Sequence, residues 1–254
     1  MWEEQALFLG EAGKTIIHES PAIKILVSLE GEFLLRSSED DSWHEYRSAM
    51  VAAGQAHAID GQGNRLALII LVPEARAAQP LIPIMSRKGI TRLPAAVVQN
   101  FMPIFAEFET VSNANIEGEK LALELLAKLR NGQELLSSTI DERVSQSVEL
   151  IRADLENIRS IKEIAANVKL SESRFSHLFT ENVRVPVRRY LLWMRLREAI
   201  HLLAGGGSLT EIAHEAGFSD SAHLTRTFRQ MLGITPSSLV KESTLTSFLD
   251  KSSD

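Results

Sequence analysis

The stretch Ser160-Ile-Lys-Glu-Ile-Ala-Ala-Asn167 is echoed later in the chain by Ser208-Leu-Thr-Glu-Ile-Ala-His-Glu215. Each copy begins with a serine that can cap a helix, and a glutamate follows three residues later, as in a capping box. Each copy is followed by a short turn and a second amphipathic stretch: Val168–Leu170 with Ser171–Asn182, and Ala216–Ser219 with Asp220–Leu232. The sequence therefore predicts helix, tight turn and helix, twice.

The second helix of each unit has apolar residues at positions i, i+3 and i+4, which predicts its inward face: Phe175, Leu178 and Phe179, and Leu224, Thr227 and Phe228. The outward face starts with Glu172 in the first unit and carries small or polar residues that we expect to read DNA bases: Ser173, Ser176 and His177, and Ser221, Ala222, Thr225 and Arg226. Hydroxyls can donate or accept, alanine can contact a thymine methyl, and arginine can bond guanine. The alternative, a merely solvated face, would more often be rich in Lys and Glu.

One long helix is predicted between the two units, over Pro186–Gly205, with proline at its start and a run of glycines at its end. It would fix the distance between the units, which must sit about one DNA turn, roughly 34 Å, apart to read one side of a duplex. We expect Arg188 and Arg189 near its start to contact DNA phosphates. For Arg195 and Arg197, phosphate contacts and intramolecular ion pairs both remain open.

The second unit continues into a longer pattern: Ile212-Ala-His-Glu-Ala-Gly-Phe218, Ser219–Phe228 and Gly233-Ile-Thr-Pro-Ser237. In residue order, turn and closing Gly-x-Thr-Pro, this pattern resembles the signature of the AraC/XylS transcription regulators. The resemblance implies DNA-binding activation or repression, contact with RNA polymerase, and base reading at the matching positions Ser173, Ser176, His177, Ala222, Thr225 and Arg226. The family often has a basic or large polar residue where Ser173 and Ser176 stand, so we expect the first unit to read fewer bases.

The N-terminal stretch from Ala6 to Val72 alternates short apolar or β-branched runs with turn residues. The runs predict strands over Lys14–Ile17, Ile23–Leu29, Glu32–Arg36, Glu45–Val51 and Arg65–Val72. Asp60-Gly61 is the sharpest of the turn signals between them. Many short strands at regular spacing favour an antiparallel barrel or sandwich.

This half also resembles the cupin-like sensor domain of the same family. Gly54-Gln-Ala-His57 is similar to the second cupin motif, with Ala52 where proline is usual. The first motif falls on His18, Ser20, Lys24 and Gly31, where a metal cupin would have His, His, Glu and Gly. Because two ligands are replaced, we expect no metal, no cofactor and no catalytic residue. His18 and His57 are either part of the small-molecule effector pocket that the resemblance implies or ordinary hydrogen-bonded residues of the barrel.

After Pro80 the apolar period changes to that of a helix, and helices are predicted over Leu93–Glu109 and Glu117–Arg130. A leucine stripe on the second can be a dimer seam or can pack on its own barrel. We therefore predict an α+β, two-domain fold: a cupin-like antiparallel β-barrel effector domain over 1–80, a helical linker and possible dimerisation region over 81–139, an all-α double helix-turn-helix over 140–240, and a C-terminal tail over 241–254.

The composition is that of a soluble globular protein, with 254 residues, 44% hydrophobic and 24% charged. No apolar run approaches the roughly 20 residues of a membrane helix, the first ten residues are acidic, and cysteine is absent, so we expect a cytoplasmic protein. The net charge of −6 is uneven: residues 1–139 have 12 Lys and Arg against 18 Asp and Glu, whereas 159–241 have 12 against 7. This modest basic excess suits phosphate contacts, although a solvated basic surface would look the same.

These features predict a sequence-specific, double-stranded DNA-binding transcription regulator of the AraC/XylS type, an activator and homodimer, modulated by a small molecule in the barrel. One alternative is an effector-independent DNA-binding protein whose barrel only oligomerises. A second is a cupin enzyme with a DNA-binding tail, which the replaced ligands disfavour.

Overall fold

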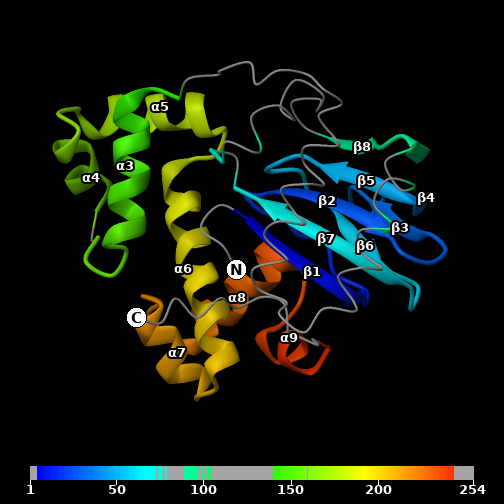
Figure 1. The fold of residues 1–254 in the computed structure, drawn as a ribbon. Coiled ribbons are helices and arrows are strands. Elements are labelled where there is room, and N and C mark those ends of the chain that lie inside the picture. Colours follow the sequence, from blue (N-terminus) through cyan, green and yellow to red (C-terminus); the bar gives the residue numbers. More distant parts are fainter. Residues whose placement is uncertain are drawn as a thin grey trace.

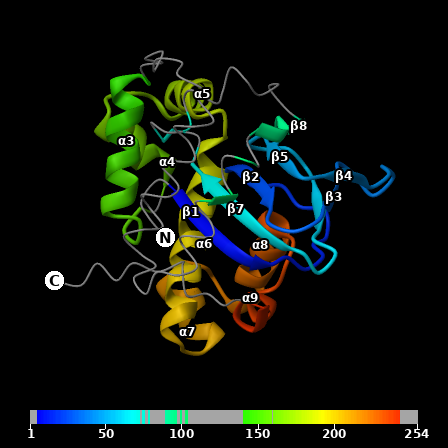
Figure 2. The ribbon, with the colours of Figure 1, turned by 45° about the vertical axis from the view of Figure 1, so that its right-hand side comes forward.

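The computed structural model describes residues 5–242 apart from 73, 76–77, 79–88, 97–98, 100–101, 104–139 and 159. A β region and a helical region lie side by side, and helix α6 (Val187–Gly205) runs at the side of the helical region that faces the strands (Figure 1). Helices α3–α5 lie near one end of α6 and α7–α9 near the other, and the second view shows the same grouping (Figure 2). The predicted combination of an antiparallel β region and a helical C-terminal half is confirmed.

The described strands form two antiparallel sheets. Their bounds are β1 Gln5–Glu11, β2 Ile23–Ser28, β3 Phe33–Arg36, β4 His44–Tyr46, β5 Ser48–Val51, β6 Ala58–Asp60, β7 Arg65–Leu71 and β8 Ile90–Arg92. The larger sheet has the order β1-β7-β2-β5-β8 and the smaller one β4-β3-β6. β2 is buried along its whole length, with Leu26 in a core that spans both sheets and Ile25 in a second core that continues into the helices.

The strand predictions needed several corrections. β1, β6 and β8 were not expected, yet all seven residues of β1 pair with β7, β6 pairs with β3, and β8 pairs with β5. The predicted strand Lys14–Ile17 is instead a bridging segment, because Thr15 bonds Ile59 while the next amide, that of Ile16, bonds Gly233 in the helical region. The predicted strand Glu45–Val51 divides at Arg47 into β4 and β5, which pair in different sheets.

Seven helices have both ends within the described residues, and all seven lie in the C-terminal portion. They are α3 Glu142–Ala153, α4 Ile161–Asn167, α5 Glu172–Val183, α6, α7 Leu209–Glu215, α8 Ser221–Leu232 and α9 Pro236–Glu242. None of the helices in the described residues is long and apolar enough to cross a bilayer. Within the predicted helix Leu93–Glu109, the described residues 95–96, 99 and 102–103 are helical, whereas the Leu93 amide bonds the Ser48 carbonyl beside β8. The rest of this helix, and all of the predicted helix Glu117–Arg130, lies outside the described residues.

Candidate functional site

The second helix-turn-helix unit is held in shape by bonds at both helix starts. Ser208 and Glu211 form the predicted capping box, in which the Glu211 amide donates to the Ser208 hydroxyl at 3.2 Å and the Ser208 amide donates to Glu211 at 3.0 Å. Asp220 caps α8 by accepting the His223 amide at 2.7 Å, and this bond, followed by one from Ser219, lowers the pKa of Asp220. The charged cap favours the helix start through the helix dipole.

The first unit is built in the same way. Ser160 caps α4 and Ser171 caps α5, each hydroxyl accepting a backbone amide at 3.3 Å. The residues predicted to point inward are buried in both units: Phe175, Leu178 and Phe179, and Leu224, Thr227 and Phe228. Phe179 also meets the ring of Tyr190 edge to face, which joins the first unit to α6. The orientation of both second helices is thereby fixed by their cores.

The residues predicted to read bases lie on the opposite faces of these helices. Ser173 and His177 on α5 and Ala222 and Arg226 on α8 are exposed, whereas Ser176, Ser221 and Thr225 are half-buried. Thr225 donates its hydroxyl to the Ser221 carbonyl at 2.8 Å, so without rearrangement it can offer a base only acceptor lone pairs. No carboxylate among the described residues lies within ion-pair distance of Arg226, which leaves its guanidinium exposed.

The two arginines predicted to contact phosphate differ in this structure. The Arg188 side chain is 83% exposed and lies 3.9 Å from Glu172, a distant and weak pairing. Arg189 instead donates to the Glu19 carboxylate at 2.6 Å and to the Glu19 carbonyl at 2.7 Å. A phosphate would have to displace this carboxylate before Arg189 could bind DNA.

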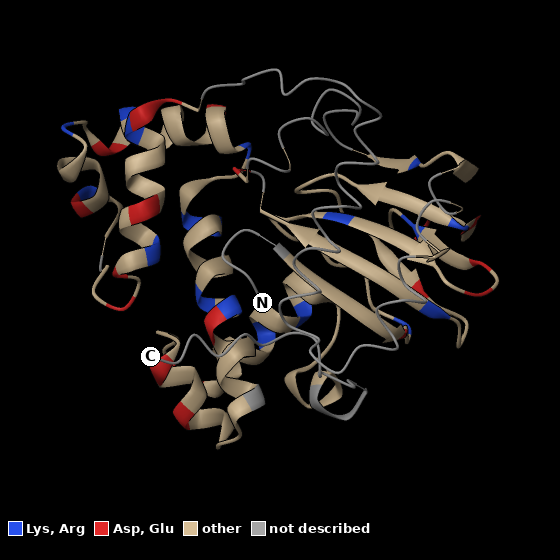
Figure 3. Cartoon of the chain, viewed as in Figure 1, with Lys and Arg blue, Asp and Glu red and all other residues tan. Residues whose placement is uncertain are grey.

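The other two arginines of α6 face the interior of the protein. Arg195 donates to the Ile158 carbonyl at 3.3 Å, and Arg197 lies near the Met194 sulfur and within electrostatic reach of Glu74. In Figure 3, basic and acidic residues are interspersed over the helices, so DNA affinity would depend on a few cations at particular places.

A segment of the β region, residues 15–19, is attached to the end of α8. The Ile16 amide donates to the Gly233 carbonyl at 3.1 Å, and the Glu19 amide donates to the Gln230 carbonyl at 2.9 Å. Gly233 has a φ of +74°, and a Cβ added there would lie 2.5 Å from His18 Nδ1. The close approach and the left-handed backbone both require glycine at this position.

A second contact between the regions involves Glu74, which follows β7 and is buried. It accepts a hydrogen bond from the Tyr190 hydroxyl on α6, and Arg152 on α3 donates to it at 3.3 Å. Burial raises the pKa of Glu74 despite these partners, and burial also raises the pKa of Tyr190. The side chains of Glu74 and Glu19 thus tie the β region to α3 and to the start of α6, and the Glu19 amide ties it to α8.

His18 and His57 are adjacent and buried, with ring centroids 4.2 Å apart. Between them stands Lys24, whose Nζ lies 2.6 Å from His18 Nε2 and 3.1 Å from His57 Nε2. Burial lowers the pKa of Lys24 to about 7 and also lowers the pKa of both histidines. An amine lies where a metal cupin has a carboxylate ligand, so this donor set does not fit a metal. The described residues contain no group of three or more His, Asp or Glu placed to hold a metal.

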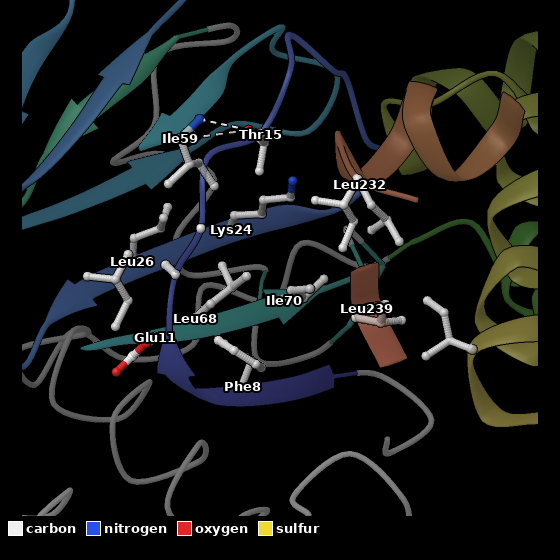
Figure 4. Close-up of a pocket in the computed structure, with 15 residues that line it drawn as sticks. Phe8, Glu11, Thr15, Lys24, Leu26, Ile59, Leu68, Ile70, Leu232 and Leu239 are labelled. Atoms are coloured by element: carbon white, nitrogen blue, oxygen red, sulfur yellow. Dashed lines mark hydrogen bonds between the residues drawn. The ribbon is translucent and has the colours of Figure 1, made fainter. Parts of the chain in front are cut away.

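Lys24 also lines a largely apolar cavity of about 150 Å³ between the two regions. Its walls come from the β region, including Phe8, Leu26 and Leu68, and from the helical region: Ile200, Leu232, Ile234 and Leu239. Figure 4 shows the Lys24 amine between Thr15 and Leu232, with aliphatic side chains around it. His18 and His57 support the lysine and are not among the residues that line the cavity.

The sequence hypothesis missed the role of Lys24 and the contribution of the helical region to this cavity. A signal for the lysine was present, since it is the one charged residue in the apolar run of β2. The helical wall had no comparable signal, because residues such as Leu232 and Leu239 fit an ordinary helix core.

Comparisons with known proteins agree with this geometry. Residues 159–242 match a family model described as a helix-turn-helix domain. The Msm operon regulatory protein of Streptococcus mutans is 27% identical over 107 residues, which are 42% of this chain and 38% of that protein. The HTH-type transcriptional regulator GbdR of Pseudomonas aeruginosa is 30% identical over 99 residues, 39% of this chain and 27% of that protein. The chain thus spans less than two fifths of the length of these relatives.

Solved structures extend the likeness to the whole fold. ToxT from Vibrio cholerae O395 superposes with a TM-score of 0.60 at 12% identity, covering 95% of this chain and 98% of ToxT. A Vibrio cholerae ToxT structure with an unsaturated fatty acid bound gives a TM-score of 0.58 at 12% identity, covering 96% and 98%. At this identity the match concerns the fold alone. Together with the two helix-turn-helix units of the structure, the match shows that residues 159–242 form a helix-turn-helix domain similar to those of these transcriptional regulators.

Proposed function

We propose that this chain is a sequence-specific DNA-binding transcription regulator of the AraC/XylS type that acts in the cytoplasm. The observation that carries the proposal is the pair of helix-turn-helix units, each with a buried inner face and an exposed outer face, joined by the continuous helix α6. A rigid connection suits two helices that must enter successive major-groove segments. The names of the relatives, which are transcriptional regulators, support the same reading.

The second unit is proposed to provide most of the sequence preference. Arg226 is exposed and can bond guanine bidentately, while the exposed methyl of Ala222 can contact thymine. On α5, the short side chains of Ser173 and Ser176 have less reach, and His177 is the longest of the three. The first unit would therefore mainly position the protein, with Arg188 on a phosphate.

A small molecule bound in the cavity between the regions is proposed to modulate DNA binding. Two observations support this: the cavity is mostly apolar, as ligand pockets are, and its walls include the end of α8 and α9. The fatty acid bound in a ToxT structure of the same fold is consistent with an apolar effector here. Association into a homodimer, contact with RNA polymerase and activation of transcription belong to the same proposal.

Selection of bound sequences from a random duplex pool tests the DNA-binding part. We expect a preferred site with two half-sites, and stronger base preference in the one read by α8. Arg226→Ala should weaken binding to that site by about 1–3 kcal/mol and relax one base position, whereas Arg188→Ala should weaken all sequences about equally and flatten the salt dependence. If Arg226→Ala distinguishes the selected site from random DNA as well as the parent does, the proposed recognition face of α8 is wrong.

A further inference from the structure

The effector cavity proposed above contains one chemically distinctive group, the Lys24 amine. The side chain is 2% exposed to solvent, yet it lines the cavity and points into it between Thr15 and Leu232 (Figure 4). Among the described residues that line the cavity, the only other ionisable group is Glu11. The described residues of the helical wall are aliphatic, so none of them offers the lysine a carboxylate.

The hydrogen bonds of the two histidines determine how Lys24 presents its nitrogen. His18 Nδ1 lies 3.0 Å from the Ile16 carbonyl and His57 Nδ1 lies 2.8 Å from the Gln55 carbonyl. A carbonyl oxygen only accepts, so each Nδ1 carries the proton and each Nε2 is an acceptor. A neutral Lys24 amine can donate its two hydrogens to these two Nε2 atoms, which leaves its lone pair free for a molecule in the cavity.

Resting on the proposed effector pocket, we propose that Lys24 is a covalent capture site that binds a small apolar aldehyde as an imine. The amine lone pair attacks the carbonyl carbon, and a proton moves from nitrogen to oxygen to give a carbinolamine. The second nitrogen proton is then transferred to the hydroxyl, which leaves as water while the C=N bond forms. The adjacent Nε2 atoms can accept and return these protons, and no oxidant or reductant is needed.

The surroundings favour a neutral carbonyl compound over an anion. Burial lowers the pKa of Lys24 to about 7, so a large share of the amine is uncharged near neutral pH, whereas an exposed lysine is almost wholly protonated. A cavity of about 150 Å³ suits a ligand about the size of benzene or slightly larger. Hexanal is a probe of this kind.

The test is reductive trapping on the full chain. The protein is incubated with hexanal and cyanoborohydride at pH 7, and the hexyl adduct on each lysine is quantified by peptide mass spectrometry. We expect Lys24 to be modified on the order of 10²-fold faster than the exposed Lys162 and Lys169 in the same sample. Equal or slower modification of Lys24 would overturn the proposal.

Hexanol and hexanoate distinguish imine formation on Lys24 from non-covalent binding in the cavity. Hexanol has the same chain without a carbonyl, so it should slow modification of Lys24 and leave Lys162 unchanged. Stabilisation of the protein by hexanoate, combined with absence of an adduct from hexanal, would show an anion site and refute aldehyde capture. Binding of the selected duplex in a gel-shift assay is scored separately, because a failure there contradicts the proposed DNA-binding function and not the chemistry of Lys24.

Discussion

At the scale of single residues, Lys24 is buried, and no carboxylate of the described part of the chain pairs with it. Its amine is satisfied by two neutral imidazoles, each held by a backbone carbonyl. A protonated lysine in such a place is disfavoured by desolvation. The cluster of Lys24, His18 and His57 should therefore control how the stability of the protein depends on pH.

The lowered pKa values determine whether the free energy of unfolding rises or falls with pH. The pKa of Lys24 is about 7 in the folded protein, so between about pH 7 and 10 the unfolded chain binds more protons than the folded one. The free energy of unfolding should therefore rise with pH in this range, by up to about 1.4 kcal/mol per pH unit. The lowered pKa of each histidine makes its contribution present above the ordinary value of 6.5 and lost as the pH falls below it. The free energy of unfolding is measured by urea unfolding at pH 7, 8 and 9. Lys24→Met should remove its rise with pH, whereas Lys162→Met should keep it. Equal slopes in both variants would contradict this account.

At the scale of secondary-structure elements, the helices were predicted well and the bridging segment was not. The second helix of each unit was placed to within one residue, because capping residues and the helical period depend on near neighbours. Residues 15–19 take their partners from Ile59, Gln230 and Gly233, far along the chain, so no local pattern could indicate them. The cupin resemblance placed His18, Lys24 and His57 at one site, but no local pattern indicated that both histidines would bond the lysine amine.

The contact between this segment and α8 can be tested at Gly233. Gly233→Ala would place a methyl group 2.5 Å from His18 Nδ1 and 2.8 Å from the Ile16 carbonyl, in a backbone conformation with φ +74°. Gly63→Ala is a matched control, since Gly63 has φ +75° and no atom lies within 4 Å of the added carbon. Backbone strain should reduce stability by about 1–2 kcal/mol in both variants.

Only Gly233→Ala should weaken the contact between residues 15–19 and α8. We expect it to lose further stability and to speed hydrogen exchange of the Ile16 and Glu19 amides, which donate to the end of α8. Unchanged exchange at these two amides, with equal stability loss in the two variants, would mean that the segment does not depend on this glycine.

At the scale of the whole molecule, two carboxylates hold the β region against the helices. Glu74 contacts Tyr190 on α6 and Arg152 on α3, and Glu19 contacts Arg189 near the start of α6. The second contact occupies an arginine predicted to bind phosphate. We infer that Glu19 competes with DNA for Arg189, and that the arrangement in this structure restrains DNA binding.

Replacing the carboxylate measures this restraint. Glu19→Gln should bind DNA about two- to fivefold more tightly, the range expected for a partly exposed ion pair, and should steepen the salt dependence by about one phosphate contact. Glu156→Gln makes the same charge change at an exposed position of the helical region and serves as the control. A similar gain in both variants would indicate a general charge effect and not release of Arg189.

The cavity shared by the β region, α8 and α9 also limits what any effector can do. A molecule bound there contacts both the β region and the helical region, so its affinity depends on how the two regions are positioned relative to each other. Binding free energies at two linked sites are reciprocal: a molecule that weakens operator binding about tenfold must itself be held about tenfold less tightly by the protein on its operator. DNA would therefore act as an effector of the cavity to the same degree that the cavity acts on DNA.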